Sequence, residues 1–257
     1  MKWLNLFKVN LKREFILLKR YLPNTISLVL TFYLIFLGMF FGIHVVGNPE
    51  TAEVNIQYAL VNYIFWFLAM SVMNGIGYTV QSEVQLGTLE QIYMSPLGAW
   101  RIFLTRIISS TITDGLIIVA MLFVSMLTAN TWLNLDFISI LPALLFTIIS
   151  MFGVSYMIAG MAIIYKQIGS FLQISQFILL GLTFVPVSVF PLLELAPAMK
   201  GVDMVRQVMI HGFSLSDFTL FDYSSLILNA IVYFVLGVIV YLRCERTAMI
   251  KGVLGQH

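Results

Sequence analysis

Apolar residues fill long stretches of this chain, and short polar segments separate them. A helix needs roughly 20 mostly apolar residues to cross the hydrocarbon core of a bilayer. Six stretches reach this length with almost no charged residue, which predicts an all-α membrane protein with six transmembrane helices. The predicted spans are residues 24–46, 57–80, 103–128, 137–163, 168–189 and 223–242.

The first 22 residues differ from these spans because apolar and basic residues recur on different faces of one helix. The apolar positions are Leu4, Phe7, Leu11, Phe15, Leu18 and Leu22, and the basic ones are Lys8, Lys12 and Lys19. An amphipathic helix of this kind lies in the membrane interface, with its lysines near anionic headgroups. We therefore expect residues 1–22 to form an interfacial helix, whose simplest role is to anchor the topology.

The segments that connect the spans on one side of the membrane differ in length. Residues 47–56 and 129–136 are short connections, whereas residues 190–222 form a long one. Prolines at 186, 191 and 197 break the end of the fifth span. Non-helical backbone at membrane depth persists only where it is buried in protein or lines a cavity. Residues 190–222 are therefore expected to form short re-entrant or surface helices within a single domain, residues 1–257.

Composition excludes several classes of protein. The chain is 60% apolar and 10% charged, whereas roughly a quarter of the residues in a soluble domain are charged. The net charge of +2 does not imply nucleic-acid binding, and one cysteine cannot form an internal disulfide. The histidines are far apart, so no metal site is expected. The sequence has neither a cleavable signal pattern nor a Gly-rich phosphate loop, so this chain is expected to bind no cofactor and catalyse nothing.

Basic residues are concentrated on one side of the predicted bundle. An even number of spans places both termini on the same side, and 12 of the 14 Lys and Arg residues fall there. Only Lys200 and Arg206 fall on the opposite side. Lys and Arg favour the cytoplasmic side of a membrane. Both termini and the polar segment Glu83–Pro96 are therefore predicted to be cytoplasmic.

Asp114 is the only acidic residue inside an apolar span. A charge at the centre of a membrane helix costs roughly 2.5–3.5 kcal/mol, so its carboxylate should face a donor such as Thr111, Thr113 or Tyr78. Two interpretations are open: a structural hydrogen bond between helices, or a group in a translocation path or proton relay. The structural interpretation is favoured because a lone acid makes no relay.

Other polar side chains recur on two of the spans. The second span carries Asn62, Trp66 and Asn74, and the fifth carries Gln173, Gln176 and Thr183. A polar stripe in lipid must face another helix or a cavity, so these residues either join helices through hydrogen bonds or line a translocation path. On the first span, Gly38 and Gly42 have the spacing of a close helix contact, within the chain or between two copies.

The polar segment Glu83–Pro96 joins the second and third spans. A helix over residues 82–94 would place Glu83, Gly87 and Glu90 along one side. The Ser-Pro pair would end this helix, because the residue before proline avoids the helical region. By spacing alone, the segment is either a solvated connection or a helix that docks into a basic groove, where glycine allows close approach.

The segment follows the pattern E-x3-G-T-L-E-x4-S-P, which resembles the signature of the ABC-2 family of ABC transporter permeases. The resemblance implies a coupling helix that fits a cleft in the ATP-binding subunit. The residues that it assigns to coupling are Glu83, Gly87, Thr88, Leu89, Glu90, Ser95 and Pro96. It also implies the type-2 exporter permease fold, a path lined by the second and fifth spans, and an interfacial helix beside the ATPase. Residues 187–190 depart from the family because they lack the glycine expected there.

The function implied by the resemblance is that of a non-catalytic permease subunit of an ABC exporter in a prokaryotic plasma membrane. Two permease subunits, as a homodimer or heterodimer, would assemble in lipid above two ATP-binding subunits that hold ATP and Mg. The substrate would be an amphiphilic drug, antibiotic, lipid or peptide, since the Gly-Thr-Leu-Glu form is closest to the drug-resistance branch. A permease for lipid-linked polysaccharide is one alternative. A proton-linked carrier that uses Asp114 is another.

Overall fold

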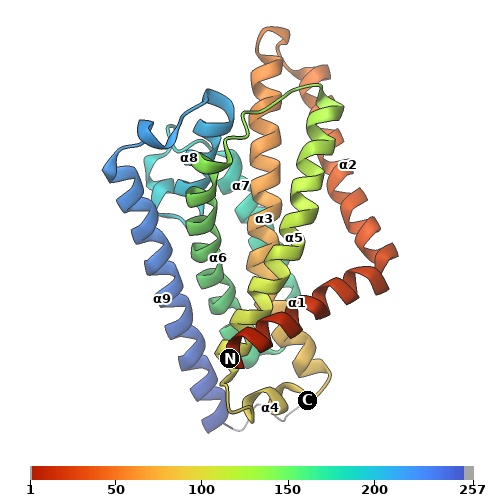
Figure 1. Cartoon of the computed structure of the whole chain (residues 1–257), viewed down its shortest axis with the longest axis vertical. Coiled ribbons are helices and arrows are strands. Elements are labelled where there is room, and N and C mark those ends of the chain that lie inside the picture. The colour runs from red at the N-terminus through yellow and green to blue at the C-terminus, as the bar shows by residue number, and fades with distance from the viewer. Residues whose placement is uncertain (1, 252–257) are drawn as a thin grey trace.

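Five long apolar helices run along the long axis of the computed structural model, which describes residues 2–251 (Figure 1). They are α2 (Leu22–Val46), α3 (Ala52–Gln85), α5 (Ala99–Ala129), α6 (Phe137–Tyr165) and α9 (Leu220–Ile250). Each is long and apolar enough to cross a membrane, and the described residues include no β-strand. The chain is therefore an all-α, multi-pass membrane protein. Five of the six predicted spans are confirmed as helices of membrane-spanning length.

The helix at the fifth predicted span, α7 (Gly169–Phe184), is shorter than these five. Its 16 residues extend about 24 Å at 1.5 Å per residue, less than the ~30 Å hydrocarbon core. The helix ends here because Pro186 disfavours helical backbone at the preceding residue, and Val185 is extended with ψ of 123°. The predicted span of residues 168–189 thus runs past the end of the helix, and a sixth crossing stays a prediction.

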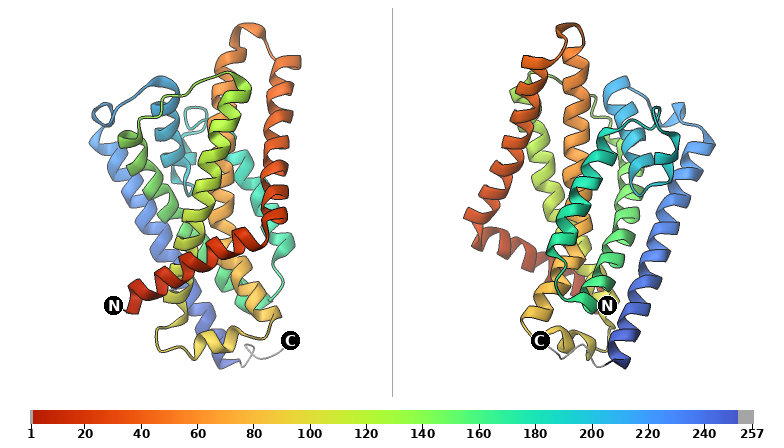
Figure 2. Two further views of the ribbon diagram at one scale, coloured as in Figure 1. Left: turned by 45° about the vertical axis from the view of Figure 1, so that its right-hand side comes forward. Right: turned by 180° about the vertical axis from the view of Figure 1, so that it is seen from behind.

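α3 lies at the centre of the bundle and contacts α2, α5, α6, α7 and α8 (Figure 2). Every side chain from Ala59 to Ala69 is buried. The sequence of α3 lacks a single apolar stripe because each of its faces meets another helix. Its polar residues are consequently placed against protein.

A close contact between two glycines joins α6 and α9. A Cβ atom added to Gly153 would lie 2.1 Å from the Tyr233 carbonyl oxygen, and one added to Gly237 would lie 2.1 Å from the Gly153 carbonyl oxygen. The two helix backbones therefore touch, as small residues allow in membrane proteins. By contrast, a Cβ atom on Gly38 or Gly42 would meet nothing within 4 Å. The predicted close contact at these two glycines is wrong within the described chain, and contact between copies stays a prediction.

The amphipathic N-terminal segment forms α1 (Lys2–Arg20), which lies across the bundle rather than along it (Figure 1, Figure 2). The buried Asn10 amide donates a hydrogen bond to Thr105 Oγ1 of α5 at 2.9 Å. Leu4 and Phe15, which the sequence places on the apolar face, are exposed on this chain. The predicted helix is confirmed for residues 2–20, and its contact with α5 uses a polar side chain that the apolar pattern did not identify.

Short helices occupy the end of the molecule that we call the α8 end. They are η1 (Pro49–Thr51), η2 (Pro191–Leu195), α8 (Met199–His211) and η3 (Leu215–Asp217). α8 packs against α3 and α6, and the Asn134 backbone N–H donates to the Met209 carbonyl at 2.9 Å, which fixes the connection before α6 to the end of α8. The predicted short helices in residues 190–222 are confirmed, and their placement in the outer leaflet stays a prediction.

Candidate functional site

The polar segment between α3 and α5 folds into a turn and a short helix, α4 (Leu89–Tyr93), at the opposite end of the molecule, the α4 end (Figure 1). The Gly87 N–H donates to the Val84 carbonyl at 3.1 Å, and the Thr88 N–H donates to the Glu83 carbonyl at 3.0 Å. This pair of bonds is the Schellman motif that ends many helices. Gly87 has a φ of 69°, in the left-handed region that glycine enters without strain.

The prediction of one continuous helix over residues 82–94 is therefore wrong. Gly87 ends the first helix, so its role here is to reverse the backbone. The predicted stop at Ser95 and Pro96 agrees with the structure, because α4 ends at Tyr93. The consequence is that Glu83 and Glu90 belong to different helices and do not share one side.

The Glu83 side chain binds two other residues of this chain. Its carboxylate forms an ion pair with Arg106 of α5 at 2.7 Å and accepts a hydrogen bond from the Thr88 hydroxyl. Both partners of the ion pair are largely buried. Of the residues predicted to meet a partner, Glu83 and Thr88 therefore brace the turn, whereas Glu90 points to solvent.

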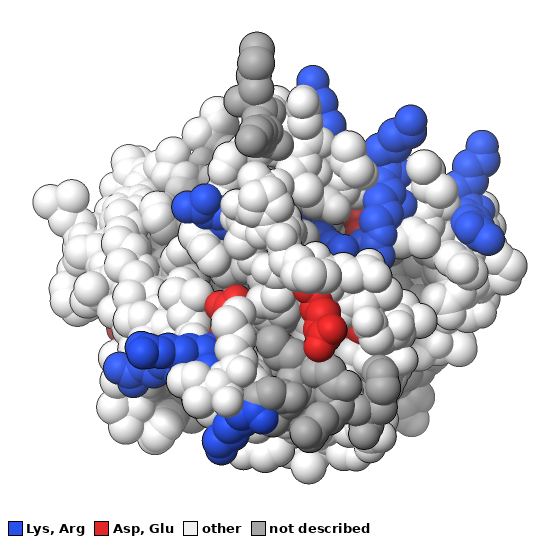
Figure 3. Space-filling model, turned by 90° about the horizontal axis from the view of Figure 1, so that it is seen from below, with Lys and Arg blue, Asp and Glu red and all other residues white. Residues whose placement is uncertain are grey.

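α4 has one buried and one exposed face. Leu89 and Ile92 are buried against the bundle, whereas Leu86 and Met94 are 71% and 77% exposed on either side of the exposed Glu90. Figure 3 shows this end from below, with Lys and Arg side chains spread around the face and acidic side chains nearer its centre. The exposed surface of the α4 segment, residues 86–94, thus combines apolar side chains before and after α4 with an acidic group on it, the composition of a docking surface.

Four aromatic side chains behind α4 connect it to the long helices. The Tyr93 hydroxyl lies 3.1 Å from the Tyr241 hydroxyl of α9. Tyr241 is fully buried and packs edge-on against Tyr156 of α6 and Phe103 of α5, at ring distances of 5.5 and 6.2 Å. The sequence did not identify this cluster, because aromatic residues are common throughout the chain and only the fold brings these four together.

Four of the polar residues predicted to line a path form hydrogen bonds involving α3 or α7, and two of them, Asn62 and Thr183, contact Arg206. Its guanidinium donates to Asn62 Oδ1 at 2.8 and 3.1 Å and to the Thr183 carbonyl at 3.0 Å. The Trp66 indole N–H donates to the Gln176 carbonyl at 3.2 Å. Gln173 is exposed on the outer face of α7 and is not part of this group.

The two basic residues at the α8 end are buried, which the sequence did not reveal. Lys200 and Arg206 are 5% and 4% exposed. Lys200 Nζ lies 3.0 Å from Glu194 and 2.8 Å from Asp222. Burial would lower the pKa of Lys200, but the hydrogen bonds with these two carboxylates outweigh it and raise the pKa. Little in the sequence signals this burial, because α8 mixes apolar residues with other polar ones such as Asp203 and Gln207.

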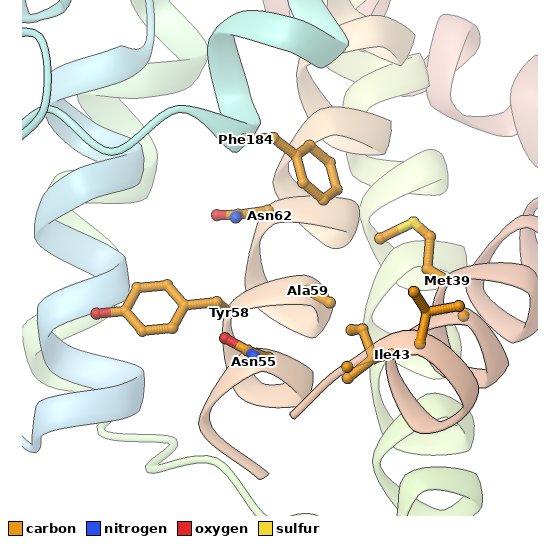
Figure 4. A pocket seen from close by; sticks show the side chains of 10 residues that line it. Met39, Ile43, Asn55, Tyr58, Ala59, Asn62 and Phe184 are labelled. Atoms are coloured by element: carbon orange, nitrogen blue, oxygen red, sulfur yellow. The ribbon is translucent and has the colours of Figure 1, made fainter. Parts of the chain in front are cut away.

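Two cavities lie on either side of the Arg206–Asn62 hydrogen bonds. The first, of about 540 Å³, lies between α2 and α3 and includes Asn62 in its wall. Figure 4 shows Met39 and Ile43 on one side of it and Phe184 at one end. The second, of about 720 Å³, lies at the α8 end and includes Arg206. Tyr58 borders both cavities, so the Arg206–Asn62 contact forms part of the wall that separates an apolar cavity from a polar one.

Asp114 of α5 and Asn74 of α3 lie apart from Arg206, where α3 and α5 face each other. Asp114 accepts a hydrogen bond from the Ser71 hydroxyl. The predicted donors Thr111, Thr113 and Tyr78 are wrong; the Thr113 hydroxyl, for example, bonds to carbonyl groups of its own helix. The predicted path residues therefore divide into two separate groups. Within residues 2–251, no cluster of His, Cys, Asp and Glu could hold a metal ion.

No protein-family model matches this chain, and neither a curated protein nor a solved structure is similar to it. The fold and the two polar groups define the class of protein: a helical membrane protein that crosses the bilayer several times. Its distinguishing element is a braced, half-exposed helix between two spans.

Proposed function

We propose that this chain is the permease subunit of an ATP-driven exporter of the ABC-2 type. The observation that supports the proposal is α4 together with the residues around it, since the segment Glu83–Pro96 has the pattern E-x3-G-T-L-E-x4-S-P. This helix lies beyond the ends of two long apolar helices, with one face anchored and the other exposed. A soluble subunit that docks on the exposed side of this helix could move it, and the anchored side would transmit the movement to the bundle.

The distribution of charge supports a cytoplasmic α4 end. α1, the first turns of α5 and the last turns of α9 carry most of the basic residues, and all three lie toward this end. Lys200 and Arg206 lie at the other end. Positive residues favour the cytoplasmic side, so the α8 end faces outward in the plasma membrane. The exposed face of α4 then meets the compartment that holds ATP.

ATP hydrolysis is assigned to a separate subunit because this sequence carries no phosphate-binding loop. Two such ATP-binding subunits, with ATP and Mg, would dock beneath two permease subunits. When they close, α4 moves, and two contacts carry the movement into the bundle. The Tyr93–Tyr241 contact leads from α4 to α9, and the Glu83–Arg106 ion pair joins the end of α3, just before α4, to α5.

The proposed path runs along α3 and α7 beside a second permease subunit. Phe171, Ile174 and Phe177 leave the outer face of α7 exposed and apolar around Gln173, which suits contact with a second copy or its equivalent. The cavity between α2 and α3 is walled mainly by apolar side chains with the amides Asn55 and Asn62, a mixture that suits an amphiphilic substrate. The Arg206–Asn62 and Arg206–Thr183 hydrogen bonds would be the outer gate, opening to join the two cavities.

The test of this function is whether α4 binds an ATPase. We expect the purified chain alone to hydrolyse no ATP, and the tagged chain to co-purify from its native membrane with an ATPase in equal numbers of chains. The double substitution Glu90→Lys with Met94→Lys changes only exposed side chains on and directly after α4, so the size-exclusion profile should not change. It should remove most of the co-purified ATPase activity.

The matched control is Glu50→Lys, which makes the same charge reversal at an exposed residue of the opposite end. It should keep the ATPase. If the α4 variant retains the same ATPase and the same ATP turnover as the parent, α4 is only a connection and the proposal is wrong. The proposal is equally wrong if the pure chain hydrolyses ATP by itself.

A further inference from the structure

A third cavity, of about 250 Å³, lies between α2, α3 and α5 and belongs to neither the α4 surface nor the Arg206 group. Asp114 enters it from the middle of α5, since this residue is equally distant from Ala99 and Ala129. Ser71 and Asn74 of α3 also line it. The cavity thus holds a carboxylate at the depth where an unpaired charge is most costly.

One hydrogen-bond acceptor at this cavity has no partner, and a second is buried beside it. The Ser71 hydroxyl bonds to one oxygen of Asp114, and no described residue donates to the other. Asn74 is 8% exposed, and its buried Oδ1 has no hydrogen-bond partner. A buried polar group without a partner costs roughly 1–3 kcal/mol. One oxygen of the Asp114 carboxylate is therefore free to pair with a ligand, next to the Asn74 amide.

No basic residue lines the cavity, and Asp114 is the only charged residue in its described lining. Among residues 2–251, no basic side chain forms an ion pair with Asp114. Arg106 lies on the same helix but is eight residues away, about 12 Å along the axis, and is paired with Glu83. Glu14 of α1 interacts with Asp114, but Glu14 is itself paired with Arg13 at 3.5 Å. The Asp114 carboxylate is therefore left without a cation of its own.

The volume of the cavity and the residues that line it indicate which kind of cation it could hold. A metal ion such as Ca²⁺ takes six to eight oxygen ligands, more than this site offers. The space exceeds the ~30 Å³ of one water several-fold, and Phe67, Met70 and Ile117 make its other walls apolar. An aromatic ring attracts a cation placed over its face. Leu28 and Tyr78 at its border are 42% and 44% exposed, so the cavity opens sideways toward the lipid.

We propose that Asp114, Asn74 and Phe67 form a binding site for an organic ammonium ion with a small apolar body, which enters from the membrane. The carboxylate pairs with the positive charge, and the Asn74 amide lines the cavity beside it. The apolar walls take the body of the ligand. This site is independent of the exporter proposal, because it needs only this chain in a bilayer.

The test measures equilibrium binding of radiolabelled benzyltrimethylammonium to the full chain in lipid nanodiscs, without any ATPase. Neopentylbenzene, which has the same shape but a carbon in place of the nitrogen, is the neutral competitor. We expect saturable binding that unlabelled ammonium displaces and neopentylbenzene does not. Asp114→Asn should weaken binding by at least about tenfold, the effect of losing ~1.4 kcal/mol. The ammonium should raise the melting temperature of the parent and not that of this variant.

Two further variants separate binding from folding. Asn74→Leu removes an unpaired buried group, so it should keep or raise the melting temperature while it weakens binding several-fold. Glu53→Gln, the same kind of charge loss at an exposed residue of α3, should leave binding unchanged. The proposal is overturned if Asp114→Asn and Asn74→Leu bind as tightly as the parent. It is also overturned if neopentylbenzene displaces the probe equally well, or if sodium ion displaces it at the same concentration as ammonium.

Discussion

At the scale of single residues, the two basic side chains at the α8 end are unusual because they are buried. Lys200 and Arg206 are the two of the 14 basic residues that lie at the α8 end, and both are almost fully buried. Lys200 pairs with carboxylates, and Arg206 donates to an amide and a carbonyl of other helices and pairs with Asp203 of its own helix. Buried charges persist in proteins only with such partners. These two residues therefore hold the α8 end together.

Replacing Lys200 with methionine should destabilise the protein. The change keeps the length of the side chain but leaves Glu194 and Asp222 facing each other without a cation. These carboxylates are partly exposed, so the cost should be about 1–3 kcal/mol, below that of breaking a fully buried pair. Thermal unfolding in detergent measures it, with exposed Lys19→Met as the control. Because pairing raises the pKa of Lys200, its contribution should persist at neutral pH and be lost only as the pH rises above the usual range of lysine.

At the scale of elements, the contact between α6 and α9 depends on the absence of side chains. Gly153→Ala would place a methyl group 2.1 Å from a carbonyl oxygen of α9, and neither backbone can move without separating the helices. We expect a loss of at least 1–3 kcal/mol, the usual range for overpacking. Gly38→Ala makes the same chemical change in open space and should be neutral. Equal melting temperatures for the two variants would contradict the contact.

Helices are the elements that the sequence predicts well, because apolar length alone identifies them. The spacing of apolar and charged residues does not predict the break between α3 and α4. The break depends on the positive φ of Gly87, and residue spacing does not show where a glycine adopts this conformation. The Arg206–Asn62 contact could not be predicted, since its partners are 144 residues apart and their spans offer no local pattern. The polar residues fall into two groups because those on α3 occupy different faces of that helix.

At the scale of the whole molecule, the chain should have both ends on one side. α1 and the last turns of α9 lie toward the same end (Figure 1), so we predict that α7 carries the chain across although it is short. In a Cys244→Ser background, a cysteine at Asn48 should react with an impermeant thiol reagent from outside. Cysteines at Gln85 and Arg246 should react only after the membrane is opened. Labelling of Arg246→Cys from outside would mean that α7 does not cross.

The contact between α1 and α5 also constrains the order of events while the protein is made. Asn10 and Thr105 are separated by 95 residues, and a ribosome adds roughly 5–20 residues per second. For about 5–20 s, α1 is complete while the helix it will rest on has yet to emerge. Its exposed apolar side chains and its lysines let the bilayer surface hold it during that interval. Amphipathic character in α1 is thus what keeps the first helix in place until its partner arrives.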